Sequence, residues 1–261
     1  MKTLKILFLF SFLMLNSMLF AQTQWRVVYQ YKKVDTEESK KRADSMMKAR
    51  PEFAEMFNKF SKQAANKIYI MHLNKNESVF KEEEKLDKPL PSRGIRFMQD
   101  AGKLLYKNLS ENTFMLLRNS FNEIYRISDT LPNYHWKITK NSKPIGQYIA
   151  IQAIGETFVK RRDGKQNKVE VMAWFTPQIP IGNGPEKYSG LPGLILELKA
   201  DRDVYLAKEI IVNPKDKIDI KAPTEGKIVS QEDFDKQVAE QIKKMREMRK
   251  SYRKRRNGRH R

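Results

Sequence analysis

Apolar and polar residues alternate along most of this chain, in short runs separated by turn-forming residues. Alternation with a period of two places successive side chains on opposite faces of a β-strand. In the segment 194–199, for example, every second residue is a leucine. The pattern predicts about ten strands, from eleven candidate segments at 25–34, 67–73, 77–81, 103–107, 113–118, 123–128, 134–140, 146–153, 168–176, 194–199 and 204–212. Most of the connections are short, which favours antiparallel neighbours.

Helical spacing replaces this alternation near the front of the chain. Asp35 and Glu38 have the spacing of a capping box. Pro51 suits the first turn of a second helix, where its missing N–H costs nothing. Between 53 and 64, apolar residues then recur every three or four positions. Such a stripe is typical of a helix that packs on a core, and a hydrophobic ligand site is the alternative.

A third helix is predicted over 230–249, because Ser230 and Asp233 form a capping box and apolar residues follow at helical spacing. Like charges crowd residues 250–261, which predicts a disordered basic tail. The fold class expected is α+β: a large, curved, mostly antiparallel, half-barrel-like sheet with N-terminal helices. One domain is expected over 22–229. Its element order is similar to that of periplasmic lipoprotein carriers.

The first residues indicate export. Lys2 and Lys5 precede an apolar run at 6–15 that is too short to span a bilayer, and Ala21 offers a small residue for cleavage. We expect a signal peptide over 1–21 and a soluble periplasmic or secreted protein; a membrane anchor is the alternative. The chain has no cysteine, which excludes disulfides, thiolate metal sites and a cysteine nucleophile.

Positive charge is concentrated at the end of the chain. The formal net charge is +20, and residues 242–261 contain 11 basic residues and one acidic residue, so that 11 − 1 = +10 lies there. Such a segment can bind an anionic lipid or polysaccharide, whereas no fold signature points to a specific nucleic acid. The alternative is a solvated extension without a partner. The candidate anion-binding residues are Lys250, Arg253, Lys254, Arg255, Arg256, Arg259 and Arg261.

Four prolines and four glycines punctuate the long connection 177–193. Prolines restrict φ and glycines permit close backbone approach, so the connection is a rigid path. Long loops of this kind are often functional; the structural alternative is a corner that sets the register of strand 194–198. The candidate ligand- or partner-binding residues are Trp174, Pro185, Tyr188, Gly190, Leu191, Pro192 and Gly193.

Residues 190–195 read Gly-Leu-Pro-Gly-Leu-Ile, and residues 174–177 upstream read Trp-Phe-Thr-Pro. With further matching letters over 134–212, this region resembles the GLPGLI family of exported proteins from Bacteroidetes-type bacteria. That family has no established biochemical activity. The resemblance therefore implies export and a shared fold, but it transfers no catalytic residue.

Catalytic motifs are absent from the sequence. The histidines His72, His135 and His260 form no metal-binding pair, and there is no nucleophile elbow, phosphate loop or dinucleotide fingerprint. No cofactor or metal is expected. The leading hypothesis is a non-enzymatic envelope protein that binds an apolar small molecule or a protein partner. One alternative is a binder of anionic polymers or membrane surfaces through the basic tail. Another is a hydrolase whose site is assembled from scattered residues, with His135 near an acid.

Overall fold

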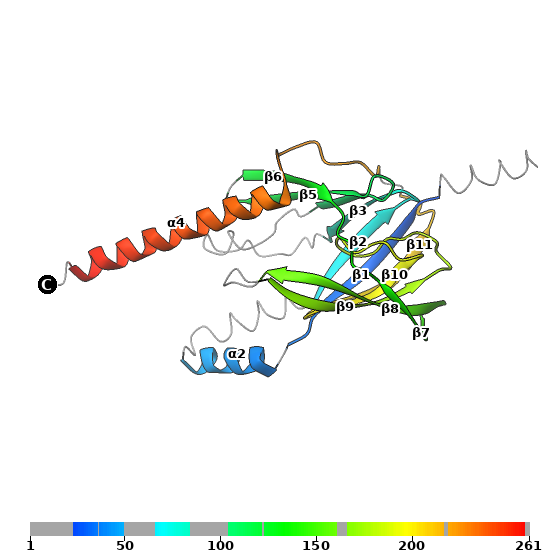
Figure 1. The fold of residues 1–261 in the computed structure, drawn as a ribbon, viewed down its shortest axis with the longest axis horizontal. Helices are drawn as coiled ribbons and strands as arrows, with labels where there is room; N and C mark the ends of the chain where they lie inside the picture. The colour runs from blue at the N-terminus through cyan, green and yellow to red at the C-terminus, as the bar shows by residue number, and fades with distance from the viewer. Residues whose placement is uncertain are drawn as a thin grey trace, which may run out of the picture.

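The computed structural model describes residues 23–35, 37–49, 66–83, 104–121, 123–160, 166–216 and 219–258. Its main element is one open sheet of twelve strands (Figure 1). The strands are β1 (Trp25–Lys33), β2 (Asn66–Leu73), β3 (Glu77–Glu82), β4 (Leu104–Asn108), β5 (Thr113–Ser120), β6 (Glu123–Thr130), β7 (Lys137–Ile145), β8 (Tyr148–Lys160), β9 (Gln166–Thr176), β10 (Leu194–Ala200), β11 (Asp203–Val212) and β12 (Lys227–Val229). Two helices are described, α2 (Glu37–Ala49) and α4 (Gln231–Gly258).

The strand order is β12-β6-β5-β4-β3-β2-β1-β11-β10-β9-β8-β7. Neighbours pair antiparallel throughout, except that β12 pairs parallel with β6. The first strand therefore lies inside the sheet, where it joins the two runs of sequential hairpins. The predicted large, mostly antiparallel sheet is confirmed, and the fold is dominated by it.

Local turn chemistry explains several of the hairpins. Between β2 and β3 the side chain of Asn74 accepts hydrogen bonds from the backbone N–H groups of Asn76 and Glu77. Between β10 and β11 the turn residue Asp201 has a φ of 51°, a conformation that Asp tolerates better than most residues. These turns stand where the sequence predicts them.

The structure differs from the strands predicted from the sequence in two places along the sheet. Gly146, expected inside a strand, lies in the turn between β7 and β8 with a φ of 58°. The preceding strand β7 continues to Ile145 across an irregularity between Ile138 and Ser142, where polar residues hide the alternation. The short strand β12 is missing from the predicted set because its three residues give too little pattern to detect.

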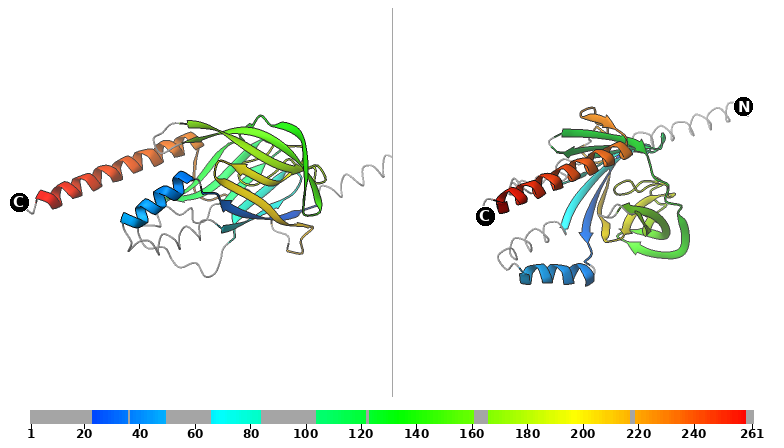
Figure 2. Two further views of the ribbon diagram at one scale, coloured as in Figure 1. Left: turned by 90° about the horizontal axis from the view of Figure 1, so that it is seen from below. Right: turned by 60° about the vertical axis from the view of Figure 1, so that its left-hand side comes forward.

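The expectation of several N-terminal helices is not supported. In the described residues α2 is the one helix that precedes the second strand. It lies to one side of the sheet in Figures 1 and 2 rather than over its face. The second helix, expected to start at Pro51, lies outside the described residues.

The C-terminal helix is longer than expected. Predicted to end at 249, α4 continues to Gly258, which replaces most of the predicted disordered tail. Lys and Arg are good helix formers, and positive charge near a helix C-terminus interacts favourably with the helix dipole. These two effects outweigh the mutual repulsion on which the prediction rested. The last residues, 259–261, lie outside the described residues.

The two faces of the sheet are covered differently. One face carries the main core, which extends from Trp25 on β1 to Phe234 on α4. On the other face a small cluster forms where Ile220, from the segment after β11, packs on Val79 and Tyr106. The main face is the one that receives the Pro/Gly-rich connection between β9 and β10.

Candidate functional site

The connection 177–193, here called the motif loop, packs several of its side chains into the protein interior. Ile179, Ile181 and Leu191 are buried members of the main core cluster. Its backbone is paired at both ends: the N–H of Leu194 donates to the carbonyl of Ile179, and that of Ile195 donates to the carbonyl of Asn183. The loop is therefore a packed corner rather than a surface flap.

Lys107 on β4 holds the middle of the motif loop. Its side chain is fully buried, with no exposed surface. The amine donates a hydrogen bond of 2.6 Å to the carbonyl oxygen of Gly184 and a longer one of 3.4 Å to that of Tyr188. Burial lowers the pKa of Lys107 to about 7, and the nearby carboxylate of Glu186 acts in the opposite direction.

This contact shows how strongly the sheet bends. Four strands separate β4 from β10 in the sheet. At about 4.8 Å per step, five steps would span about 24 Å in a flat sheet. Lys107 nevertheless contacts the loop that feeds β10, so the sheet curves around the motif loop. Ile179, Ile181 and Leu191 of the motif loop thus take up part of the space that a curved sheet offers to an apolar ligand.

Aromatic side chains cover the other side of the motif loop. The indole N–H of Trp136 donates to the carbonyl oxygen of Ser189 at 2.9 Å. Tyr134 stacks on Tyr188 with ring centroids 4.6 Å apart. The hydroxyl of Tyr205 donates to the carboxylate of Glu186 at 3.2 Å. Burial raises the pKa of Tyr188 and of Tyr205 above the ordinary tyrosine value.

Two glycines of the motif loop are required by the backbone. Gly190 has a φ of 89°, in the region that L side chains rarely adopt. At Gly193 an added Cβ would lie 2.2 Å from the carbonyl oxygen of Thr176, which is far inside contact distance. The Gly-Leu-Pro-Gly turn is thus explained by packing.

The structure brings most of the predicted loop residues together but separates Trp174 from them. Pro185 and Leu191 are buried, Tyr188 is half-buried, and Gly190 and Pro192 are exposed. Trp174 lies on β9 between the buried residues Ala173 and Phe175 and therefore points to the opposite face of that strand. The amine of Lys143 lies over its ring, 4.3 Å from the ring centroid.

The histidines lie outside this cluster. His72 is half-buried on β2, and its burial lowers its pKa to about 4. His135 is exposed in the segment before β7 with a φ of 49°. His135 has an electrostatic influence on the carboxylate of Glu156, which is paired with Lys168 at 2.5 Å.

A second candidate site is the helix α4, whose first turns are anchored on the sheet. Phe234 is 2% exposed and packs edge-on against Tyr125 of β6, with ring centroids 5.2 Å apart. Ser230 caps the helix by accepting the N–H of Asp233. The motif loop contributes as well, since the amine of Lys187 donates to the side chain of Gln231 at 2.9 Å.

Beyond this anchor α4 projects away from the body (Figures 1 and 2). The helix has 28 residues and is therefore about 42 Å long at about 1.5 Å per residue. Residues 242–258 contain nine basic residues and one acidic residue. The side chains of Lys243, Lys244, Arg246 and Lys250 are exposed. Of the predicted tail residues, Lys250, Arg253, Lys254, Arg255 and Arg256 thus belong to the helix, whereas Arg259 and Arg261 lie outside the described residues.

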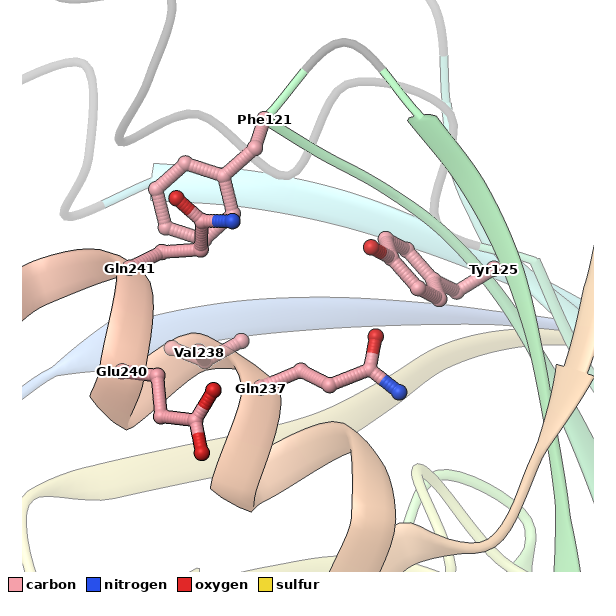
Figure 3. A pocket seen from close by; sticks show the side chains of 6 residues that line it. All are labelled: Phe121, Tyr125, Gln237, Val238, Glu240 and Gln241. Carbon is pink, nitrogen blue, oxygen red and sulfur yellow. The ribbon is translucent and has the colours of Figure 1, made fainter.

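A small cavity lies where α4 leaves the sheet. It has a volume of about 60 Å³ and is lined by Phe121, Tyr125, Gln237, Val238, Glu240 and Gln241. Figure 3 shows the two aromatic residues facing the helix across this gap. Ligand pockets for small molecules are usually about 300–1,000 Å³, so this cavity is a packing gap at the anchor. In the described part of the chain, no helix is both long and apolar enough to cross a membrane.

Comparison with known proteins finds a family model of unknown function that matches the segment containing the motif loop. A family model described as "Protein of unknown function (Porph_ging)" matches residues 136–197. This is the same segment that carries the resemblance to the GLPGLI family. No curated protein sequence matches the chain.

Two solved structures of PNGF-II, in the C2 and P21 space groups, are similar to part of this chain. Their TM-scores are 0.47 and 0.46, at 15% and 14% sequence identity. The similarity covers 80% of this chain but 31% of the PNGF-II chain. The chain thus spans about a third of the length of these solved structures.

Sequence reasoning missed Lys107, Tyr134 and Tyr205, which hold the motif loop, and it missed Glu186 within the loop. One signal was available for Lys107. It stands two residues after Leu105 in a predicted strand, so alternation places it on the same face as that buried leucine. Its partner at Gly184 is 77 residues away, and no local pattern links the two.

Proposed function

We propose that this chain is an exported, non-enzymatic envelope protein that binds a phosphate-bearing anionic surface through α4. The single observation that carries the proposal is the exposed basic helix projecting from a packed body. About 1 kcal/mol per Lys or Arg is a typical gain close to an anionic surface. Residues 242–258 contain nine basic residues and one acidic residue, so the helix has enough positive charge to bind a phosphate-bearing surface.

Export is supported by the N-terminal residues Lys2 and Lys5 and the apolar run at 6–15. The periplasm or the cell exterior places such a helix among anionic lipids and polysaccharides. The leading hypothesis from the sequence is binding of an apolar small molecule or a protein partner. Binding of an apolar small molecule inside the half-barrel-like sheet is less well supported, because side chains of the motif loop pack into the core there. The role of the motif loop in this proposal is to shape the sheet and to hold the start of α4 through Lys187.

The experiment compares two triple variants of equal charge. In one variant Lys243, Lys244 and Arg246 of α4 are replaced by Gln. In the matched control three exposed lysines of the body, Lys75, Lys140 and Lys199, are replaced by Gln. Both changes lower the net charge by three, so any difference between them reports position alone.

The measurement is the salt concentration that elutes each protein from a phosphate-bearing cation exchanger. The α4 variant loses about 3 kcal/mol of binding and elutes at clearly lower salt. The control variant elutes close to the wild-type protein. Equal shifts for the two variants would show that binding follows overall charge, and would refute a dedicated role for α4.

A further inference from the structure

The apolar residues of α4 form a stripe that continues past the body of the protein. They stand at 234, 238, 242, 245 and 248, which places them within an arc of about 120° on a helix of 3.6 residues per turn. The start of the stripe is covered: Phe234 is 2% exposed and Val238 packs against the main core. Further along, Ile242 is 37% exposed and Met248 is 54% exposed.

Basic residues predominate on the rest of the helix circumference beyond the body, where Glu247 is the one acidic residue, and Arg249 lies within the apolar arc. Lys243, Arg246 and Lys250 fall outside the apolar arc, and their side chains are exposed. A helix with an apolar stripe and Lys or Arg on its remaining faces is the type that lies in the plane of a membrane interface. In that position the stripe is buried among the acyl chains while the charges stay at the headgroups.

We infer that α4 inserts the Ile242 and Met248 side of this stripe into the surface of an anionic lipid bilayer; this rests on the proposed function of α4. Two features of the helix, its charge and its apolar stripe, favour a bilayer over other partners. A second copy of α4 would bring two strongly positive helices together, which like-charge repulsion opposes. A soluble polyanion would neutralise the charges but leave the apolar stripe in water. An anionic bilayer both neutralises the positive charges and removes the apolar stripe from water.

The absence of cysteine in the chain permits a direct test, because a single introduced thiol takes up a label at one position. Ile242→Cys and Glu247→Cys are each labelled with a polarity-sensitive fluorophore. The two positions are five residues apart and hence about 140° apart around the helix. Each labelled protein is mixed with vesicles of zwitterionic lipid with added phosphatidylglycerol, and with inorganic polyphosphate as the soluble polyanion.

The inference predicts a blue shift at position 242 with anionic vesicles, little shift at 247, and no shift at either position with polyphosphate. As a second measurement, Ile242→Ser with Met248→Ser lowers vesicle affinity about tenfold or more. The matched pair Ile138→Ser with Ile149→Ser, which are 53% and 55% exposed on β7 and β8, leaves it unchanged.

The outcomes separate the two proposals. Binding to vesicles without a shift at 242, or with equal shifts at both positions, overturns insertion and leaves electrostatic binding intact. If the label at 242 shifts without vesicles, and the shift grows with protein concentration, the stripe packs against a second copy of the chain. That result also overturns insertion into a bilayer. Failure to bind both vesicles and polyphosphate overturns the proposed function itself.

Discussion

The buried amine of Lys107 makes the stability of this protein depend on pH in a way that can be calculated. Burial lowers the pKa of Lys107 to about 7 in the folded protein, whereas a lysine in an unfolded chain titrates near about 10.4. Between these values the unfolded chain binds the proton that the folded chain has released. The free energy of unfolding therefore rises with pH in this window, by about 1.4 kcal/mol per pH unit at most.

The variant Lys107→Met removes this dependence. From about pH 7 to about pH 9.5 the wild-type protein gains about 3 kcal/mol relative to the variant. The window stops there because tyrosines begin to titrate near about pH 10 in the unfolded chain. At neutral pH the variant loses the hydrogen bond to Gly184, worth about 1.5–3 kcal/mol. It also escapes the cost of burying a charge, so the two effects largely cancel there.

The assay is chemical denaturation of both proteins at several pH values across this window. Lys199→Met, which changes an exposed lysine on β10, serves as the matched control and follows the wild-type pH profile. Parallel profiles for Lys107→Met and the wild-type protein would refute the reasoning, since the amine would then titrate alike in the folded and unfolded chains.

Two further predictions concern the motif loop and the helix anchor. Gly193→Ala places a methyl group against the carbonyl of Thr176 and lowers the free energy of unfolding by about 3 kcal/mol; Gly146→Ala, which meets no atom within 4 Å, costs only the strain of its positive φ, about 1 kcal/mol. Equal losses in denaturant titrations would contradict this. Phe234→Ala empties a buried site and costs about 3 kcal/mol, with faster amide exchange in the first turns of α4, whereas Met248→Ala changes neither. Unchanged exchange in α4 of the Phe234 variant would show that another contact holds the helix.

The sheet could be predicted from the sequence because its information is local. Alternation in segments such as 194–199 is read within a few residues, and the turn residues Asn74 and Asp201 mark where the hairpins reverse. The prediction failed at β7, where the polar residues near the irregularity at Ile138 carry no alternation. It also stopped α4 too early, because charge repulsion was weighed without the favourable helix propensity of Lys and Arg.

The candidate sites could be predicted only in part. The Pro and Gly content of 177–193 indicated a rigid loop, and the structure shows the reason in the close approach of Gly193 to Thr176. The hydrogen bond from Lys107 to Gly184 joins β4 to a loop 77 residues away in the chain, so it depends on the curvature of the whole sheet. The direction in which α4 projects depends likewise on a long-range contact, the packing of Phe234 against Tyr125.

The most direct test of the account is co-sedimentation of the protein with vesicles of zwitterionic lipid, with and without added phosphatidylglycerol. The account predicts that the wild-type protein binds only the anionic vesicles, and that the triple variant at Lys243, Lys244 and Arg246 loses this binding. The control variant in the body of the protein keeps it. Equal binding to both kinds of vesicle, or equal loss by the two variants, would contradict the claim that α4 is the surface-binding element.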